Sequence, residues 1–192
     1  MKFISVSDDE FNIIQHQNII MKDFVCHYLS YKRFHSKRDE LKGEKGFWVH
    51  TVNAHIMVCF NFWCMIFGSE NNNNLHWKNL NFNIENIQNV FEEKLLKELS
   101  LTQNEWKNLR RSIITFRNKY IAHRDIGYKE PVPYLDNAYK AIIIYSNWLR
   151  EDVLVYSDML VSGVTLEQIA SLHENMIDQT LIHIVGDNQL QS

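Results

Sequence analysis

The chain is poor in the residues that form turns. Only two Pro and six Gly occur among its 192 residues, and a sandwich or barrel with many strands needs more turn residues than this. Its five Trp, eight Tyr and eleven Phe exclude an intrinsically disordered chain. We therefore expect an all-α protein, and the length predicts a single helical domain over residues 1–192.

Common cofactor and metal motifs are also missing. The sequence contains no GxGxxG, no GxxxxGKS/T, no HExxH and no Glu-x-x-His pair, which argues against a dinucleotide fold, a P-loop and a di-iron bundle. Cys26, Cys59 and Cys64 lie in apolar runs without CxxC spacing, as reduced thiols do. The N-terminus becomes acidic within eight residues and lacks the basic region and long apolar stretch of a signal peptide. We expect a cytoplasmic protein that needs no metal and no cofactor.

One segment tests the assignment to a soluble protein. From Gly46 to Ser69 no Asp, Glu, Lys or Arg occurs, and the segment is long enough to cross a bilayer. Its interior carries five polar side chains, however, which are costly at bilayer depth. We therefore predict a central core helix rather than a membrane span, with His50, Asn53 and Asn61 forming a buried polar stripe whose hydrogen bonds are satisfied.

Capping patterns and apolar spacing predict five or six antiparallel helices joined by short connections. Capping boxes occur at Ser7–Glu10, Thr102–Glu105 and Thr165–Gln168. The expected helices run from Ser7 into a charged connection at 32–45, over 47–67, over 83–100, from Thr102 through Tyr120, over 134–160 and from Thr165 to Gly186. His76-Trp77, after an Asn-rich loop, is expected to anchor that loop.

The charge is distributed unevenly along the chain, although the net charge is only −3. Residues 105–129 carry seven basic and two acidic side chains, whereas residues 151–192 carry seven acidic side chains and no Lys or Arg. An anionic ligand would be attracted to the first segment. The alternative is that both segments are solvated helix faces.

The most informative stretch is Arg-Asn-Lys-Tyr-Ile-Ala-His-Arg-Asp at 117–125, which ends the basic helix. An Arg with a polar residue behind it, and a His six positions further on, resembles the signature of the HEPN superfamily. The sequence of these nine residues is especially similar to that of its abortive-infection branch. This resemblance implies an all-α, RNA-cleaving bundle that works as a homodimer, with two copies of the motif facing one another.

The resemblance assigns catalytic roles to Arg117, Asn118 and His123. An imidazole exchanges protons near neutral pH and suits a general base and acid. A guanidinium matches phosphate oxygens, and Asn118 suits the orientation of His123 or a phosphate contact. Three neighbouring side chains are expected to bind RNA through charge and stacking, namely Lys119, Arg124 and Tyr128. An antitoxin is a further expected partner.

The spacing leaves one structural question. Six residues at about 100° each place Arg117 and His123 about 120° apart on a continuous helix. Either the helix ends near Ala122 and redirects His123, or long side chains and a second subunit complete the site.

Each residue also has a structural alternative. His123 would be a packed or helix-capping side chain, and Arg117 would pair with Asp125 or with the acidic C-terminal region. The whole chain would then be a non-catalytic module that binds nucleotide, RNA or protein. A bundle that binds a metal or a small molecule is a third class.

Overall fold

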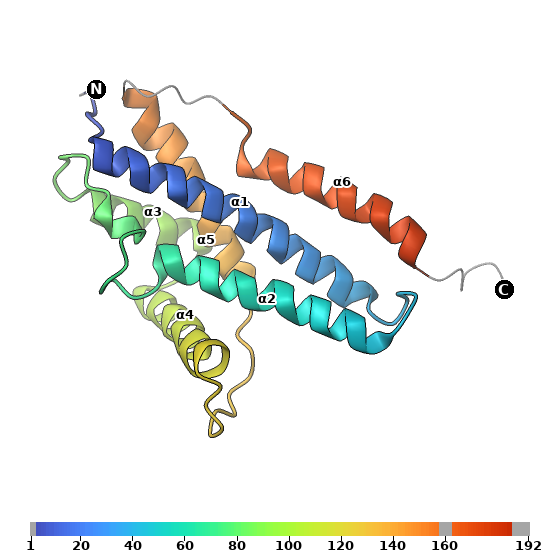
Figure 1. Cartoon of the computed structure of the whole chain (residues 1–192). Coiled ribbons are helices and arrows are strands. Elements are labelled where there is room, and N and C mark those ends of the chain that lie inside the picture. The colour runs from blue at the N-terminus through green and yellow to red at the C-terminus, as the bar shows by residue number, and fades with distance from the viewer. Residues whose placement is uncertain (1–2, 158–162, 186–192) are drawn as a thin grey trace.

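The computed structural model describes residues 3–157 and 163–185, and within them it confirms the all-α bundle. Six α-helices and no strands occur in this part of the chain (Figure 1). The helices are α1 (Asp8–Lys37), α2 (Lys45–Phe67), α3 (Ile87–Leu99), α4 (Gln103–Phe116), α5 (Asp136–Asn147) and α6 (Leu166–Ile184).

Local capping chemistry starts three of these helices as the sequence predicts. In each capping box the hydroxyl at the N-cap accepts a hydrogen bond from the backbone N–H three residues on. The side chain at that third position in turn accepts from the N-cap backbone N–H, so two donors that the helix leaves free are satisfied. The pairs are Ser7 with Glu10, Thr102 with Glu105 and Thr165 with Gln168.

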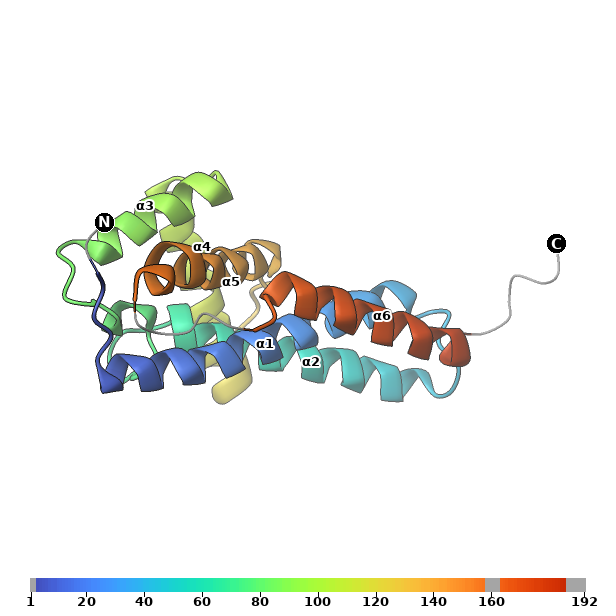
Figure 2. The ribbon, with the colours of Figure 1, turned by 90° about the horizontal axis from the view of Figure 1, so that it is seen from above.

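The long helix α1 is the centre of the arrangement. It forms an antiparallel hairpin with α2, and α6 lies along its other side, as the views in Figures 1 and 2 agree. α5 packs against both α1 and α3, and α4 packs against α2. One connected apolar core joins all six helices. It is rich in aromatic side chains, including Trp63, Phe67, Phe91, Trp106 and Tyr145.

Two helices begin or end differently from the prediction. α1 continues to Lys37, so the connection to α2 is shorter than 32–45. α3 begins at Ile87 instead of 83 because Asn83 and Asn86 have φ of 52° and 60°, a left-handed conformation that Asn tolerates but an α-helix excludes.

The segment predicted as one helix over 134–160 is divided into helical elements of different types. A π-helical turn (Trp148–Val153) and a 3₁₀ turn (Leu154–Tyr156) follow α5. The predicted ends at 160 and Gly186 lie outside the described residues.

Only half of α2 is a core helix. Phe60, Trp63 and Phe67 near its C-terminal end are fully buried, whereas Phe47 at its start is 63% exposed. The start of α2 extends along α1 beyond α3, α4 and α5, and besides α1 only α6 reaches the same end of the described bundle (Figure 1). Of the described helices, α2 alone is long and apolar enough to cross a membrane, and 33% of its most apolar 18-residue window is buried.

The predicted polar stripe on α2 is wrong. His50 and Asn53 are exposed and Asn61 is half-buried, and among the described elements α2 packs mainly against α1. The predicted loop anchor after α2 is confirmed, since His76 and Trp77 are 1% and 3% exposed. Burial lowers the pKa of His76 to about 4, and its Nδ1 accepts the backbone N–H of Lys78.

Candidate functional site

The candidate motif forms a wide turn at the end of α4. Residues Arg117–Ala122 are π-helical, and His123 follows as the first residue outside the turn. The Asp125 backbone N–H donates to the Lys119 carbonyl over 2.7 Å and closes the motif. Single π-helical turns occur frequently at functional sites. The helix thus ends near Ala122. This is one of the two arrangements that the six-residue spacing of Arg117 and His123 allowed.

Arg117 is half-buried and lies against α2. Its guanidinium is close to the Cys64 thiol, where its charge and hydrogen bond oppose the burial that raises the pKa of this thiol. In the described residues Arg117 forms no ion pair, and Asp125 instead lies 3.9 Å from Lys119. The alternative in which Arg117 pairs with Asp125 is therefore wrong.

His123 is exposed, with φ of −116° and ψ of −11°. The rings of Phe116 and Tyr120 stack on each other at 5.0 Å, and within the described residues neither ring pairs with the His123 ring. The alternative of a packed histidine is therefore wrong, whereas its position at the helix end agrees with a capping role. Asn118 is half-buried, and its side chain forms no hydrogen bond with any described residue. Nor does a hydrogen bond join the side chains of Arg117 and His123 within the described part of the subunit.

The three predicted RNA-binding side chains surround this turn. Lys119 is exposed beside Asp125. The Arg124 guanidinium lies 4.5 Å from the centre of the Tyr120 ring, on a backbone with φ of 49°. This left-handed conformation is costly for Arg, and stacking on an aromatic face offsets part of that cost. Tyr128 is half-buried, with its ring 6.0 Å from that of Phe116.

The basic residues of α4 divide into two groups. Arg110 donates to the carbonyls of Phe67 and Gly68 over 2.9 and 2.8 Å, so it caps the C-terminal end of α2. This structural role joins residues more than 40 positions apart in sequence, and no local pattern indicates it. Arg111 is exposed and, within the described residues, forms no ion pair. Only part of the local positive charge is therefore available to a ligand.

Two hollows flank α4 next to the motif. One, of about 510 Å³, lies between α4 and residues 68–71 and contains Lys107, Arg110 and Arg111. The other, of about 880 Å³, lies between α4, residues 128–134 and the first turns of α5. Arg111 and Thr115 line both hollows, so the two meet across the exposed face of α4.

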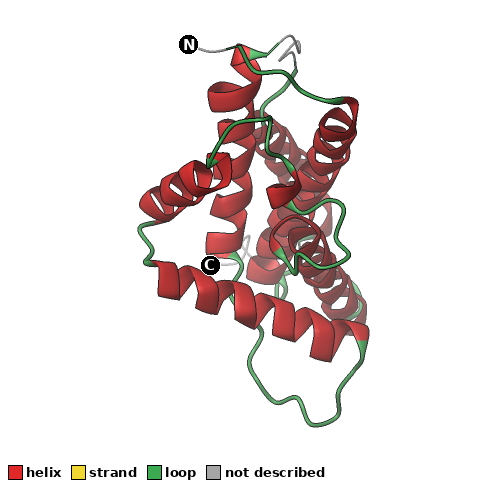
Figure 3. Cartoon of the chain, turned by 90° about the vertical axis from the view of Figure 1, so that its left-hand side faces the viewer, coloured by secondary structure: helices red, strands yellow, loops and turns green. Residues whose placement is uncertain are grey.

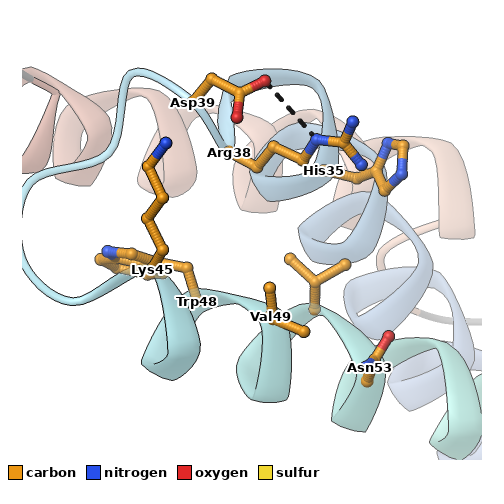
Figure 4. A pocket seen from close by; sticks show the side chains of 8 residues that line it. His35, Arg38, Asp39, Lys45, Trp48, Val49 and Asn53 are labelled. Atoms are coloured by element: carbon orange, nitrogen blue, oxygen red, sulfur yellow. Dashed lines mark ion pairs between the residues drawn. The ribbon is translucent and has the colours of Figure 1, made fainter.

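A further hollow of about 290 Å³ lies far from the motif, where α1 ends and α2 begins (Figure 4). Trp48 forms its apolar wall, and Arg38 pairs with Asp39 at 3.6 Å on its rim. Lys45 at this end of α2 and Cys64 beside Arg117 are 19 residues apart, roughly 28 Å along a helix. This hollow is therefore separate from the candidate site.

Sequence reasoning missed a pair of histidines between α1 and α2. The Nδ1 atoms of His27 and His55 are 2.8 Å apart, so one ring donates a hydrogen bond to the other. Burial lowers the pKa of both rings, and the neighbouring His173 lowers them further. In the described residues, no three His, Cys, Asp or Glu side chains are grouped so as to hold a metal ion.

Comparisons with known proteins give no assignment: no family model, no curated protein and no solved structure matches this chain.

Proposed function

We propose that the chain is a metal-independent endoribonuclease of the toxin or phage-defence type, acting in the cytoplasm as a homodimer. The observation that carries the proposal is the Arg-Asn-x4-His motif. It stands on a π-helical turn with His123 in solvent and positively charged side chains around it. An antitoxin that restrains the toxin is part of the same proposal, and association with a membrane is not.

The chemistry requires one base, one acid and one positive charge. His123 removes the proton from a ribose 2′-OH, and the oxygen attacks the adjacent phosphorus while the bond to the 5′-oxygen breaks. The 5′-oxygen takes a proton from the imidazolium, which leaves a 2′,3′-cyclic phosphate and a 5′-hydroxyl. Arg117 binds the phosphate oxygens on which negative charge develops. Asn118 orients the imidazole or contacts the phosphate.

The homodimer matters because the side chains of Arg117 and His123 form no hydrogen bond with each other within the described part of one subunit. Arg117 extends toward Cys64 on α2, whereas His123 extends from the end of the π turn. A second subunit that presents the same turn would place an Arg from one chain near a His from the other. In this arrangement Lys119, Arg124 and Tyr128 from both chains surround the bound RNA.

The test compares the wild type with His123→Ala and His50→Ala on single-stranded RNA in EDTA. His50 is also exposed but lies on α2, outside the motif, so its variant is the matched control. We expect cleavage by the wild type and by His50→Ala, and a loss of at least 100-fold in His123→Ala, the typical lower bound for general acid–base catalysis. Equal cleavage by all three proteins would refute the proposal.

A second candidate is a non-catalytic module that binds RNA or nucleotide through the same residues. The lack of a hydrogen bond between Arg117 and His123 within the described part of one chain favours it. RNA binding by both the wild type and His123→Ala, without cleavage by either, would support this candidate, since a fold does not by itself imply an activity.

A further inference from the structure

The 880 Å³ hollow has the composition of a binding groove. It lies on the side of α4 next to the loop that follows the motif, and this loop extends from the bundle at the bottom of Figure 3. We name it the tyrosine groove. It is lined by residues 108–115 of α4, by 128–134 of the loop and by 136–140 of α5.

One polar face of α4 forms the first wall. Asn108, Arg111, Ser112 and Thr115 all line the groove, and their spacing of three, four and seven residues places them on one side of a helix. An amide, a guanidinium and two hydroxyls at this surface offer both donors and acceptors. The side chain of Asn108 forms no hydrogen bond within the described residues, so its amide is available to a ligand.

The opposite wall supplies aromatic rings. Tyr134 is 89% exposed although it lines the groove, and Tyr128 is half-buried. A large exposed aromatic side chain with no ring contact in the described residues is suited to stack on a planar ligand. Asn137 also lines the groove, and its side chain forms no hydrogen bond with a described residue, so it offers a second amide for a base edge.

The charges of the groove leave two cations for an anion. Arg111 and Lys140 line it and form no ion pair with any described residue. Asp136 is already occupied, because it accepts the Tyr28 hydroxyl over 2.6 Å and Lys32 over 3.2 Å. Glu130 is the remaining acidic group. Planar stacking surfaces, free amides and two cations together match a nucleobase joined to a phosphate.

We propose that the tyrosine groove binds a nucleotide of single-stranded RNA, with its base on Tyr134 and its phosphate at Arg111 and Lys140. The volume of about 880 Å³ is within the usual range for small-molecule sites. Arg117 directly follows α4 and is six residues from Arg111, roughly 9 Å along the helix axis. The proposal rests on the proposed function, since it gives RNA a second point of attachment beside the motif.

Binding is measured separately from cleavage. A labelled single-stranded oligoribonucleotide is titrated with His123→Ala protein in EDTA, and its fluorescence anisotropy gives the Kd. Tyr134→Ala, Tyr134→Phe and Arg111→Gln are added to this protein. Phe47→Ala and Arg38→Gln are the controls, because both side chains lie at the far end of the α1–α2 hairpin. Circular dichroism shows whether each variant is folded.

We expect Tyr134→Ala to weaken binding by about tenfold, as the loss of one stacked base does. Tyr134→Phe keeps the ring and should change the Kd by less than about twofold, since stacking persists. Arg111→Gln should lower the slope of log K against log salt by about 0.7, which is the value for one lost phosphate contact on a single strand. The two controls should leave both quantities unchanged.

The proposal is overturned if Tyr134→Ala and Arg111→Gln bind as their controls do, or if the oligoribonucleotide does not bind at all. This result is distinguishable from failure of the ribonuclease proposal. If binding depends on Tyr134 but the wild type does not cleave RNA, the groove is supported and the nuclease is refuted. Cleavage by the wild type, together with binding that does not depend on Tyr134, refutes the groove and supports the nuclease.

Discussion

Glu10 connects the start of α1 to a distant loop, and its removal has a calculable cost. Its carboxylate accepts from the Ser7 backbone N–H and hydroxyl over 3.0 and 2.8 Å, and from the backbone N–H groups of Asn81 and Phe82 over 3.1 and 2.6 Å. The side chain is buried, with 7% of the residue exposed. Burial alone would raise the pKa of Glu10, but these hydrogen bonds outweigh it and hold the pKa below its usual value.

The substitution Glu10→Gln keeps the shape and removes the charge. One of the two oxygens becomes an NH₂ group, so at least one backbone N–H loses its acceptor and the others lose a charged partner. An unsatisfied buried donor costs about 1–3 kcal/mol, and we therefore expect a loss of about 2 kcal/mol in the free energy of unfolding at pH 7. Urea unfolding followed by circular dichroism measures it.

Glu105→Gln is the matched control, because Glu105 has the same capping-box position but accepts only from Thr102 at an exposed helix start. The loss there should be clearly smaller. Because the folded-state pKa of Glu10 is lowered, its stabilisation is complete above about pH 4.3 and disappears as the pH falls through the folded-state pKa. A cost of Glu10→Gln equal to that of Glu105→Gln, or one that does not shrink in acid, would refute this reasoning.

Two further predictions concern the same fold. Arg110→Gln should lower the free energy of unfolding by about 1–3 kcal/mol, because two carbonyls at the end of α2 lose a charged donor. The substitution Arg111→Gln, at an exposed residue, should leave this free energy nearly unchanged. Equal losses in urea unfolding would contradict the capping role of Arg110. His76 should stay neutral down to about pH 4 in an NMR titration. The free energy of unfolding should therefore decrease as the pH falls from about 6.5 toward that value, because only the unfolded chain takes up this proton. Titration of His76 near pH 6.5 in the folded protein would refute its burial.

The helix starts could be predicted because their chemistry is local. Three capping boxes place both partners within four residues, and all three form. The π-helical turn of the motif could not be predicted in this way. A spacing of four residues between Phe116 and Tyr120 fits both an α-helix and the observed turn, in which the rings stack at 5.0 Å. The helix end near Ala122 was one of two solutions that the spacing allowed, and the π-helical geometry of this end was not predicted.

Contacts between distant parts of the chain also escaped sequence reasoning. The sequence identified Arg110 only as part of a basic segment, although its side chain caps the end of α2 at Phe67, 43 residues earlier. His27 and His55 meet across the α1–α2 hairpin at 2.8 Å, and neither has a local signal. The tyrosine groove exists because residues 128–134 lie against α4 and α5. The motif residues were identifiable from their order in the chain, but their environments depend on which helices pack beside them.

The ribonuclease proposal is tested most directly by the chemistry of the ends that it leaves. RNA incubated in EDTA with the wild type and with His123→Ala is analysed by mass spectrometry. The proposal predicts fragments with a 2′,3′-cyclic phosphate and a 5′-hydroxyl from the wild type, and intact RNA from the variant. Intact RNA with both proteins, or the same fragments from both, would contradict it.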